Sequence, residues 1–344
     1  MKKGFVKSVL PFMCVLALLG CAKEKKTGTD TAGKAAKKYT WTAALNVAET
    51  TINYKIVAKF KENIERESNG AVVVNIYPNG QLGGDREMLE GLVNGSINFS
   101  STMTSGMVGF VPQYAIFDMP SVFSDITNMR KVLSDKEFID KMNSYSKANG
   151  IYVLGYSDAG FRQMTSNKLA ESVAGMKGIK IRVIQNPYHI EYWKLLGANP
   201  LPMDFSEVYI GLQQGEIDAQ ENPYMNIVGN KFYEAQKYAI ETNHLGHTIT
   251  FLMNNALYEG LSEDMKRLVD KCAADANNYG NGIADDSIIA DKKVCTDAGM
   301  KIIELSAAEH EKMKAMSQPV YNMVTEKVGS ELVSFFLKKI EDNK

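Results

Sequence analysis

The first part of the chain alternates between strand patterns and helix patterns. Apolar runs at residues 39–47, 72–77 and 97–101 predict strands, and amphipathic runs at residues 50–69 and 85–95 predict the helices between them. A strand–helix–strand–helix–strand order is typical of a parallel sheet with right-handed crossovers. The sequence therefore predicts an α/β fold.

The alternation continues, and the chain is predicted to cross between two domains. Further strands are expected at 115–119, 151–155, 179–184, 217–219, 249–253 and 301–303, with helices at 127–149, 187–196, 205–214 and 262–294 and two more before Lys344. We expect domain I to comprise 39–159 plus 248–288, and domain II to comprise 160–247 plus 289–344. Repeated crossings predict a hinge and a ligand cleft between two α/β domains.

The N-terminus has the pattern of an export signal. Positive residues precede an apolar run at 9–19, which ends in Gly20-Cys21. This run resembles the bacterial lipoprotein signal, so we expect residues 1–20 to be a signal peptide and Cys21 to be acylated. An ordinary signal peptide with a chance cysteine is the alternative. Residues 21–38 are rich in Lys, Thr, Gly and Ala and have no large apolar side chain, which predicts a flexible tether.

Charge and cysteine spacing exclude several classes of site. The formal net charge of −1 over 344 residues argues against a nucleic-acid partner. Cys272 lies in the predicted helix at 262–294 and Cys295 at its end, so the helix would hold their thiols too far apart for a disulfide. Neither has a histidine at zinc spacing, so we expect no metal site, and no cofactor motif is present.

One arginine in an apolar strand is the main candidate for binding chemistry. Arg182 lies among Ile179, Ile181, Val183 and Ile184, and its strand contains no acid to pair it. A guanidinium offers two parallel donors to a carboxylate, so Arg182 is a candidate ligand clamp. A structural salt bridge to a distant acid is the alternative. Arg162, in the first crossing, is a second candidate, with a surface arginine as its alternative.

Several motifs resemble those of the substrate-binding proteins of TRAP transporters, the tripartite ATP-independent periplasmic carriers of organic acids. In order they are QLGGDREML from Gln81, KIRV from Lys180, GANP from Gly197, FSEVY from Phe205, LQQG from Leu212 and DAQENP from Asp218. The resemblance extends from about Tyr39 to the C-terminus. It implies a periplasmic-binding-protein-like fold with one long helix that spans both domains.

The resemblance also implies roles for individual residues. The ligand-clamping arginine falls on Arg182, and a second ligand-facing arginine falls on Arg162. The remaining implied positions are the amide of Asn222, the aromatic ring of Phe205 over the ligand, Asn46 after the first strand, and His244. Loop residues Thr102 and Met103 complete the predicted ligand-binding set.

The segment at residues 100–107 departs from the sialic-acid branch of the family. It carries neither the acid nor the arginine that read the sugar there, so sialic acid is not expected. Its hydroxyls and methionines suit a smaller or more apolar ligand. A C4-dicarboxylate, a sugar acid such as a uronate, and an apolar-tailed or keto monocarboxylate stay open.

These patterns together predict a lipid-anchored extracytoplasmic solute-binding protein. It would capture a carboxylate by domain closure and deliver it to TRAP permease subunits at the membrane. A sensor that presents an organic acid to a signalling partner is the alternative. An enzyme is not expected, because His244 is the only plausible general base and no catalytic motif is present.

Overall fold

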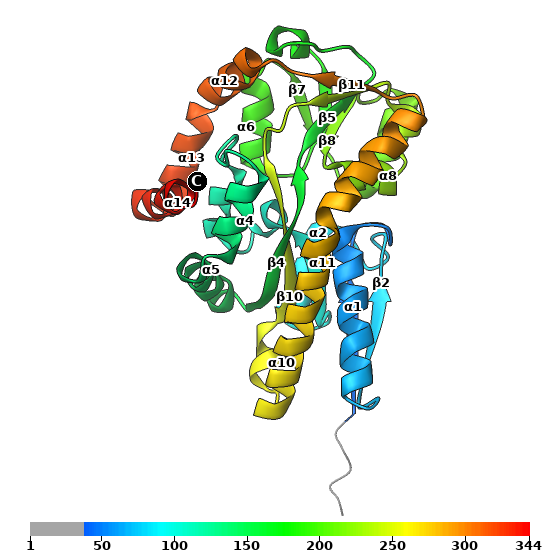
Figure 1. Cartoon of the computed structure of the whole chain (residues 1–344), viewed down its shortest axis with the longest axis vertical. Helices are drawn as coiled ribbons and strands as arrows, with labels where there is room; N and C mark the ends of the chain where they lie inside the picture. The colour runs from blue at the N-terminus through cyan, green and yellow to red at the C-terminus, as the bar shows by residue number, and fades with distance from the viewer. Residues whose placement is uncertain (1–37) are drawn as a thin grey trace, which may run out of the picture. The chain divides into compact units, whose positions relative to one another are not determined.

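A computed structural model describes residues 38–344, which contain two β-sheets surrounded by helices (Figure 1). The predicted signal peptide, Cys21 and most of the tether lie outside the described residues. Within the part that the structure describes, no helix is both long enough and apolar enough to cross a membrane.

Sheet A contains five strands in the order β2-β1-β3-β10-β4. Their bounds are β1 Tyr39–Ala44, β2 Val72–Tyr77, β3 Phe99–Met103, β4 Ile151–Phe161 and β10 Gly246–Asn254. β1 pairs in parallel with β2 and β3, as the alternation predicts, whereas β10 runs antiparallel between β3 and β4.

Sheet B contains six strands in the order β11-β9-β5-β8-β6-β7. Their bounds are β5 Gln163–Ser166, β6 Lys180–Val183, β7 Asn199–Pro202, β8 Ala219–Asn222, β9 Tyr238–Glu241 and β11 Lys301–Glu304. β6 is parallel to β7 and β8, and β5 is antiparallel to β8 and β9.

The helices lie between the strands and after the last strand along the chain. Those before β6 are α1 Ile52–Glu67, α2 Asp85–Asn94, α3 Thr104–Met107, η1 Pro112–Asp118, α4 Ile126–Ser134, α5 Lys136–Ala148 and η2 Val173–Met176. The later ones are α6 Pro187–Leu195, η3 Phe205–Glu207, α7 Val208–Gln214, α8 Tyr224–Gly229, α9 Phe232–Ala235, α10 Asn255–Glu259, α11 Glu263–Asp297, α12 Ala307–Met316, α13 Gln318–Val328 and α14 Ser330–Asp342.

Two adjacent backbone segments connect the sheets. Arg162 lies alone between β4 of sheet A and β5 of sheet B, and a short loop ending at Leu245 leads from β9 back to β10. The two segments are joined, because the Arg162 backbone N–H donates to Leu245 O at 2.9 Å. α11 is the third link: it packs on α1 and β4 beside sheet A and on α8 beside sheet B (Figure 1).

Apolar packing explains why α1 and α11 form where the sequence predicts them. Phe60 of α1 packs on Phe99 and Phe251 of sheet A, with ring centroids 5.0 and 5.2 Å away. α11 comes close to α1 at Gly280, where a Cβ would lie 2.5 Å from Ile56 Cγ1. A small residue is therefore needed at that crossing. The expected α/β fold with two sheets and one long helix is confirmed.

Four local predictions are wrong. Residues 115–119 do not form a strand but belong to the 3-10 helix η1, which Pro112 begins; its apolar run is buried on all sides, and burial does not distinguish a strand from a helix. The helix at 127–149 is two helices, because Asp135 accepts from Phe138 N–H and caps α5. β4 continues to Phe161, and three helices instead of two follow β11.

The cysteines lie as expected on one helix. Cys272 and Cys295 are both buried free thiols of α11. Burial raises the pKa of Cys272 to about 11 and that of Cys295 to about 12, so both are protonated at neutral pH.

Candidate functional site

A small inner cavity of about 30 Å³ lies at the ends of β3, β6 and β8. Every predicted ligand-binding residue except His244 lines it, namely Asn46, Thr102, Met103, Arg162, Arg182, Phe205 and Asn222. The sequence did not single out the others, which are Val47, Asn53, Asp85, Ile184, Asn226 and His247.

Strand geometry explains how distant residues meet there. Arg182 is in β6 and Asn222 ends β8, and these parallel neighbours bring their carboxyl ends to the same edge of sheet B. Thr102 and Met103 end β3 at the corresponding edge of sheet A. The carboxyl ends of strands are where open α/β sheets bind ligands.

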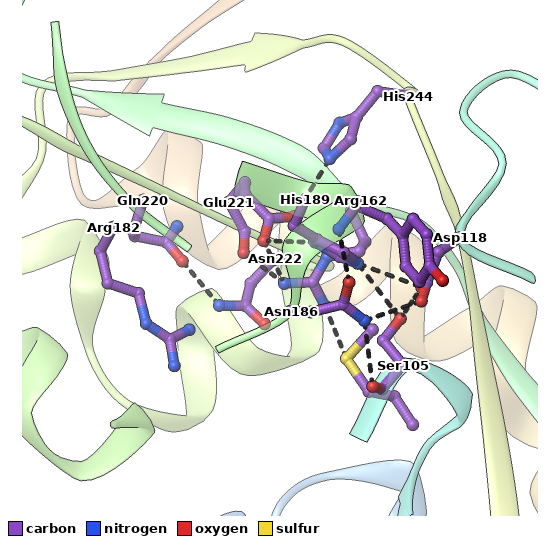
Figure 2. Close-up of polar contacts among 12 residues, drawn as sticks. Ser105, Asp118, Arg162, Arg182, Asn186, His189, Gln220, Glu221, Asn222 and His244 are labelled. Carbon is purple, nitrogen blue, oxygen red and sulfur yellow. Dashed lines mark hydrogen bonds and ion pairs between the residues drawn. The ribbon is translucent and has the colours of Figure 1, made fainter. Parts of the chain in front are cut away.

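Arg182 is buried without an anionic partner. Its side chain is 3% exposed, and its Nε and Nη2 donate to Met203 O at 2.9 and 2.7 Å. The guanidinium lies 5.6 Å from the centre of the Phe205 ring. No carboxylate of residues 38–344 forms an ion pair with it, and in Figure 2 no dashed line reaches it. Desolvation lowers the pKa of Arg182 to about 10.

Arg162 differs, because its charge is matched within the protein. Its Nη2 lies 2.9 Å from Glu221 Oε1, and its Nε donates to Oε2 of the same carboxylate. Nη1 faces the cavity side, where it contacts His247 Nδ1 at 2.9 Å and Met103 Sδ at 3.4 Å. Arg162 therefore lines the cavity but is held in a bidentate salt bridge.

Glu221 also belongs to a buried ionic cluster behind the cavity (Figure 2). His189 lies between two carboxylates, with Nδ1 3.5 Å from Glu221 Oε1 and Nε2 3.2 Å from Asp118 Oδ1. Desolvation lowers the pKa of His189, but the hydrogen bonds and charges of Asp118 and Glu221 outweigh it and raise the pKa to about 9. The positive charges of Arg162 and His189 thus balance the negative charges of Glu221 and Asp118.

His244 does not line the inner cavity. Its Nε2 donates to Glu221 Oε2 at 3.0 Å, and its Nδ1 accepts from Thr242 Oγ1 at 2.8 Å. His247, which the sequence interpretation did not assign to the ligand, lines the cavity. Arg162 donates to Nδ1 of His247, so a neutral His247 keeps its proton on Nε2. Desolvation lowers the pKa of His247 well below its usual value.

Asp85 brings a carboxylate to the cavity from the first turn of α2. Thr102 Oγ1 donates to Asp85 Oδ1 at 2.8 Å. Desolvation raises the pKa of Asp85, and the charge of Arg182 acts in the opposite direction. The motif around Asp85 was visible in the sequence, but a position at the start of a helix gave no signal that this residue lines the cavity.

A larger outer cavity of about 650 Å³ adjoins the inner one. Both are lined by Asp85, Arg182, Ile184 and Phe205. The outer cavity therefore leads from the protein surface to the Arg182 guanidinium. Another cavity, of about 1050 Å³, shares no lining residue with the inner one and has no part in this site.

Residues 43–327 match the family model described as bacterial extracellular solute-binding protein, family 7. The chain belongs to this family. The match covers sheet B, all of sheet A except the start of β1, and all the residues that line the inner cavity. The expected membership in the TRAP substrate-binding proteins is therefore confirmed, and the family comprises transport receptors and not enzymes.

Two curated relatives illustrate the family. The chain is 34% identical to the C4-dicarboxylate-binding periplasmic protein DctP of Rhodobacter capsulatus, over 84% of this chain and 87% of that protein. It is 29% identical to the 2,3-diketo-L-gulonate-binding periplasmic protein YiaO of Escherichia coli, over 80% and 83% of the two chains.

Solved structures with bound acids have the same fold. The sugar acid binding protein DctPAm of Advenella mimigardefordensis, in complex with galactonate, superposes with a TM-score of 0.86 at 28% identity, over 90% of this chain and 99% of that one. A TRAP solute-binding protein of Shewanella oneidensis with bound succinate gives a TM-score of 0.83 at 28% identity, over 89% and 100%.

Proposed function

We propose that this family 7 protein captures an organic acid and that Arg182 clamps its carboxylate. The observation that supports this role is the buried Arg182 guanidinium, which donates only to the Met203 carbonyl and has no carboxylate partner among residues 38–344. Burying an unpaired charge is unfavourable, and a ligand carboxylate would compensate it with charge-assisted hydrogen bonds. The acids named for the relatives, C4-dicarboxylates and sugar acids, support the same ligand class.

The other cavity residues would complete the contact. Asn222 offers its second amide N–H, and His247 offers Nε2–H as a further donor. Phe205 would cover the ligand, and Arg162 would act through Nη1, which also contacts His247 and Met103, while Glu221 keeps it in place. His244 would hold the Glu221 carboxylate and so affect the ligand indirectly.

Ligand capture would require movement between the sheets. The inner cavity of about 30 Å³ has the volume of roughly one water molecule in the liquid. An organic acid would therefore enter through the outer cavity while the two sheets are apart, and closure would then exclude water. We place the moving bodies at 39–159 plus 248–288 and at 160–247 plus 289–344, with the crossing segments around Arg162 and Leu245 as the hinge.

We also propose that the protein is an extracytoplasmic lipoprotein which delivers its ligand to a TRAP permease. The apolar run ending in Gly20-Cys21 supports acylation of Cys21, and the family supports the permease partner. The two parts have separate tests. Labelling cells with radioactive palmitate should mark the wild type and Cys272→Ser but not Cys21→Ser; label on Cys21→Ser would contradict the anchor.

The ligand itself can be identified by mass spectrometry of small molecules released from the purified protein. The wild type should release an organic acid in near-equimolar amount, and Arg182→Ala should release little of it. Arg267→Ala is the matched control, because Arg267 lies at the surface, where it pairs with Asp264. Equal amounts of the acid from Arg182→Ala would contradict the clamp.

A further inference from the structure

Asn226 of α8 lines the inner cavity and carries an acceptor that is unpaired within residues 38–344. Its side chain is 4% exposed, and its Oδ1 has no hydrogen-bond partner within residues 38–344. Its Nδ2 is occupied, because it donates to Asn222 Oδ1 at 2.9 Å. An unpaired buried acceptor is unfavourable, so a ligand group that donates to it would be favoured.

A series of hydrogen-bonded side chains fixes the orientation of the Asn226 amide, and it begins at Gln236. Gln236 Nε2 donates to the backbone carbonyls of Asp218 and Ala235, at 3.3 and 3.2 Å. A carbonyl can only accept, so Gln236 Oε1 is the atom that faces Thr165. Thr165 Oγ1 donates to that oxygen at 3.0 Å. Because the hydroxyl has one proton, its oxygen must accept from the next residue of the chain.

The donor-to-acceptor direction of these hydrogen bonds continues as far as the cavity. Gln220 Nε2 donates to Thr165 Oγ1 at 2.8 Å, and Gln220 Oε1 accepts from Asn222 Nδ2 at 2.7 Å (Figure 2). Asn222 Oδ1 then accepts from Asn226 Nδ2, which leaves Asn226 Oδ1 at the end. Flipping any one of these amides would place two donors or two acceptors against each other. The backbone anchor at Gln236 therefore dictates an acceptor, and not a donor, at the cavity.

Two further acceptors surround the same space. Asn53 of α1 is 1% exposed; its Nδ2 donates to Ser101 Oγ at 3.1 Å, and its Oδ1 has no partner in the described chain. The carboxylate of Asp85 also lines the cavity and accepts from Thr102 on one oxygen. Asn53, Asp85 and Asn226, which we call the acceptor set, come from α1, α2 and α8.

The charges of the site allow for one ligand carboxylate. Arg162 is matched by Glu221, so Arg182 is the cavity cation that lacks an ion-pair partner in residues 38–344. One carboxylate would pair directly with Arg182, on which Asp85 acts only from beyond ion-pair distance. A second carboxylate would add negative charge beside Asp85 and would oppose its oxygens to those of the acceptor set.

We propose that the acceptor set binds hydroxyl groups, so that the ligand is a polyhydroxylated monocarboxylate, of the aldonate or uronate class. This inference rests on the proposed function, because it assigns the carboxylate end of the ligand to Arg182. Hydroxyl groups supply the donors that Asn53 Oδ1 and Asn226 Oδ1 lack within residues 38–344, and the Asp85 carboxylate lines the same cavity as a third acceptor. A site built around such groups rejects analogues without them strongly, because its own polar atoms would stay unpaired.

Calorimetric titration of the full folded protein, freed of bound solutes, tests the ligand class directly. The probes are galactonate, galacturonate, glucuronate and erythronate, compared with succinate, adipate and hexanoate. The best hydroxylated acid should bind about 100-fold more tightly than any of the other three. Tighter binding of succinate, adipate or hexanoate, or no binding of any hydroxylated acid, overturns the inference.

Substitution of the terminal amide tests the residue. Asn226→Leu should weaken the best hydroxylated acid about tenfold more than it weakens hexanoate, which has no hydroxyl to donate to Asn226, whereas the control Asn322→Leu, on the exposed face of α13, should change neither. Asn53→Leu should act in the same direction, so the assignment can still be tested if one of the two variants folds poorly. Unchanged discrimination in both folded variants overturns the assignment.

The outcome also separates this inference from the function on which it rests. If succinate binds best and Arg182→Ala abolishes that binding, the ligand class is wrong and the carboxylate clamp stands. If Arg182→Ala binds as well as the wild type, the clamp itself fails.

Discussion

The Arg162 guanidinium is bound by the Glu221 carboxylate through two hydrogen bonds, one of 2.9 Å between Nη2 and Oε1, although 59 residues separate them. This pair leaves Arg182 as the arginine available to a ligand. Removing the charge of Arg162 should therefore destabilise the protein, whereas removing the charge of Arg182 should not.

Glu221→Gln should lower the free energy of unfolding by about 3–5 kcal/mol, because Arg162 and His189 would lose the carboxylate between them. Urea denaturation measures the change. Glu90→Gln is the control, since Glu90 pairs with the exposed Arg86 and should alter the free energy by less than about 1 kcal/mol. Equal values for the two variants would show that the buried pair does not hold the cluster.

Stability should decrease as the pH rises through 9. The pKa of His189 is raised to about 9 in the folded protein by Asp118 and Glu221, against an ordinary value of 6.5. The stabilisation is therefore complete below pH 6.5 and is lost as the pH passes 9, with an amplitude of about 3 kcal/mol. Urea unfolding at pH 6, 7.5 and 9.5 measures it. His189→Gln should remove this part of the pH dependence; an unchanged profile would contradict the assignment.

Gly84→Ala should obstruct closure. Gly84 caps α2 with φ −77° and ψ −173°, which alanine adopts without strain, but its Cβ would overlap the Asp204 carboxylate of the segment before η3. Ligand affinity should fall about tenfold, as expected for overpacking at a close contact, with little change in the unfolding of the ligand-free protein. Gly109→Ala, whose Cβ meets no atom within 4 Å, is the control. Equal affinities of the two variants would contradict closure at Gly84.

Local patterns predicted the elements that local physics determines. α1 and α11 have strong apolar periodicity, and their predicted bounds agree with the structure to within a few residues. η1 was mistaken for a strand because its apolar run is buried on all sides, so that neither period is visible in it. The α4–α5 boundary was missed because it depends on a single capping residue, Asp135.

The site was predicted only in part for a related reason. Arg182 stood out because an arginine in an apolar strand is unfavourable without a partner. The pairing of Arg162 with Glu221 was not visible, since it joins β8 to the crossing segment across 59 residues. Asn53 and Asn226 lie in helices, where an asparagine has no distinctive pattern, and only the hydrogen-bond network shows that their oxygens have no partner within residues 38–344.

We propose that Arg182 is kept buried and without an ion-pair partner in the described chain in order to bind a carboxylate. Arg182→Met keeps most of the side-chain volume and removes the charge. The ligand-free variant should therefore be as stable as the wild type or about 1 kcal/mol more stable, while losing all ligand-induced stabilisation. Arg162→Met should instead destabilise the ligand-free protein by about 3–5 kcal/mol, because Glu221 would lose its partner.

The most direct measurement is the thermal unfolding of the wild type, Arg182→Met and Arg162→Met, each with and without a saturating organic acid that binds the wild type. We predict that Arg182→Met unfolds at or above the temperature of the ligand-free wild type and that the acid does not shift it. An acid-induced shift equal to that of the wild type, or a ligand-free Arg182→Met as unstable as Arg162→Met, would contradict the account.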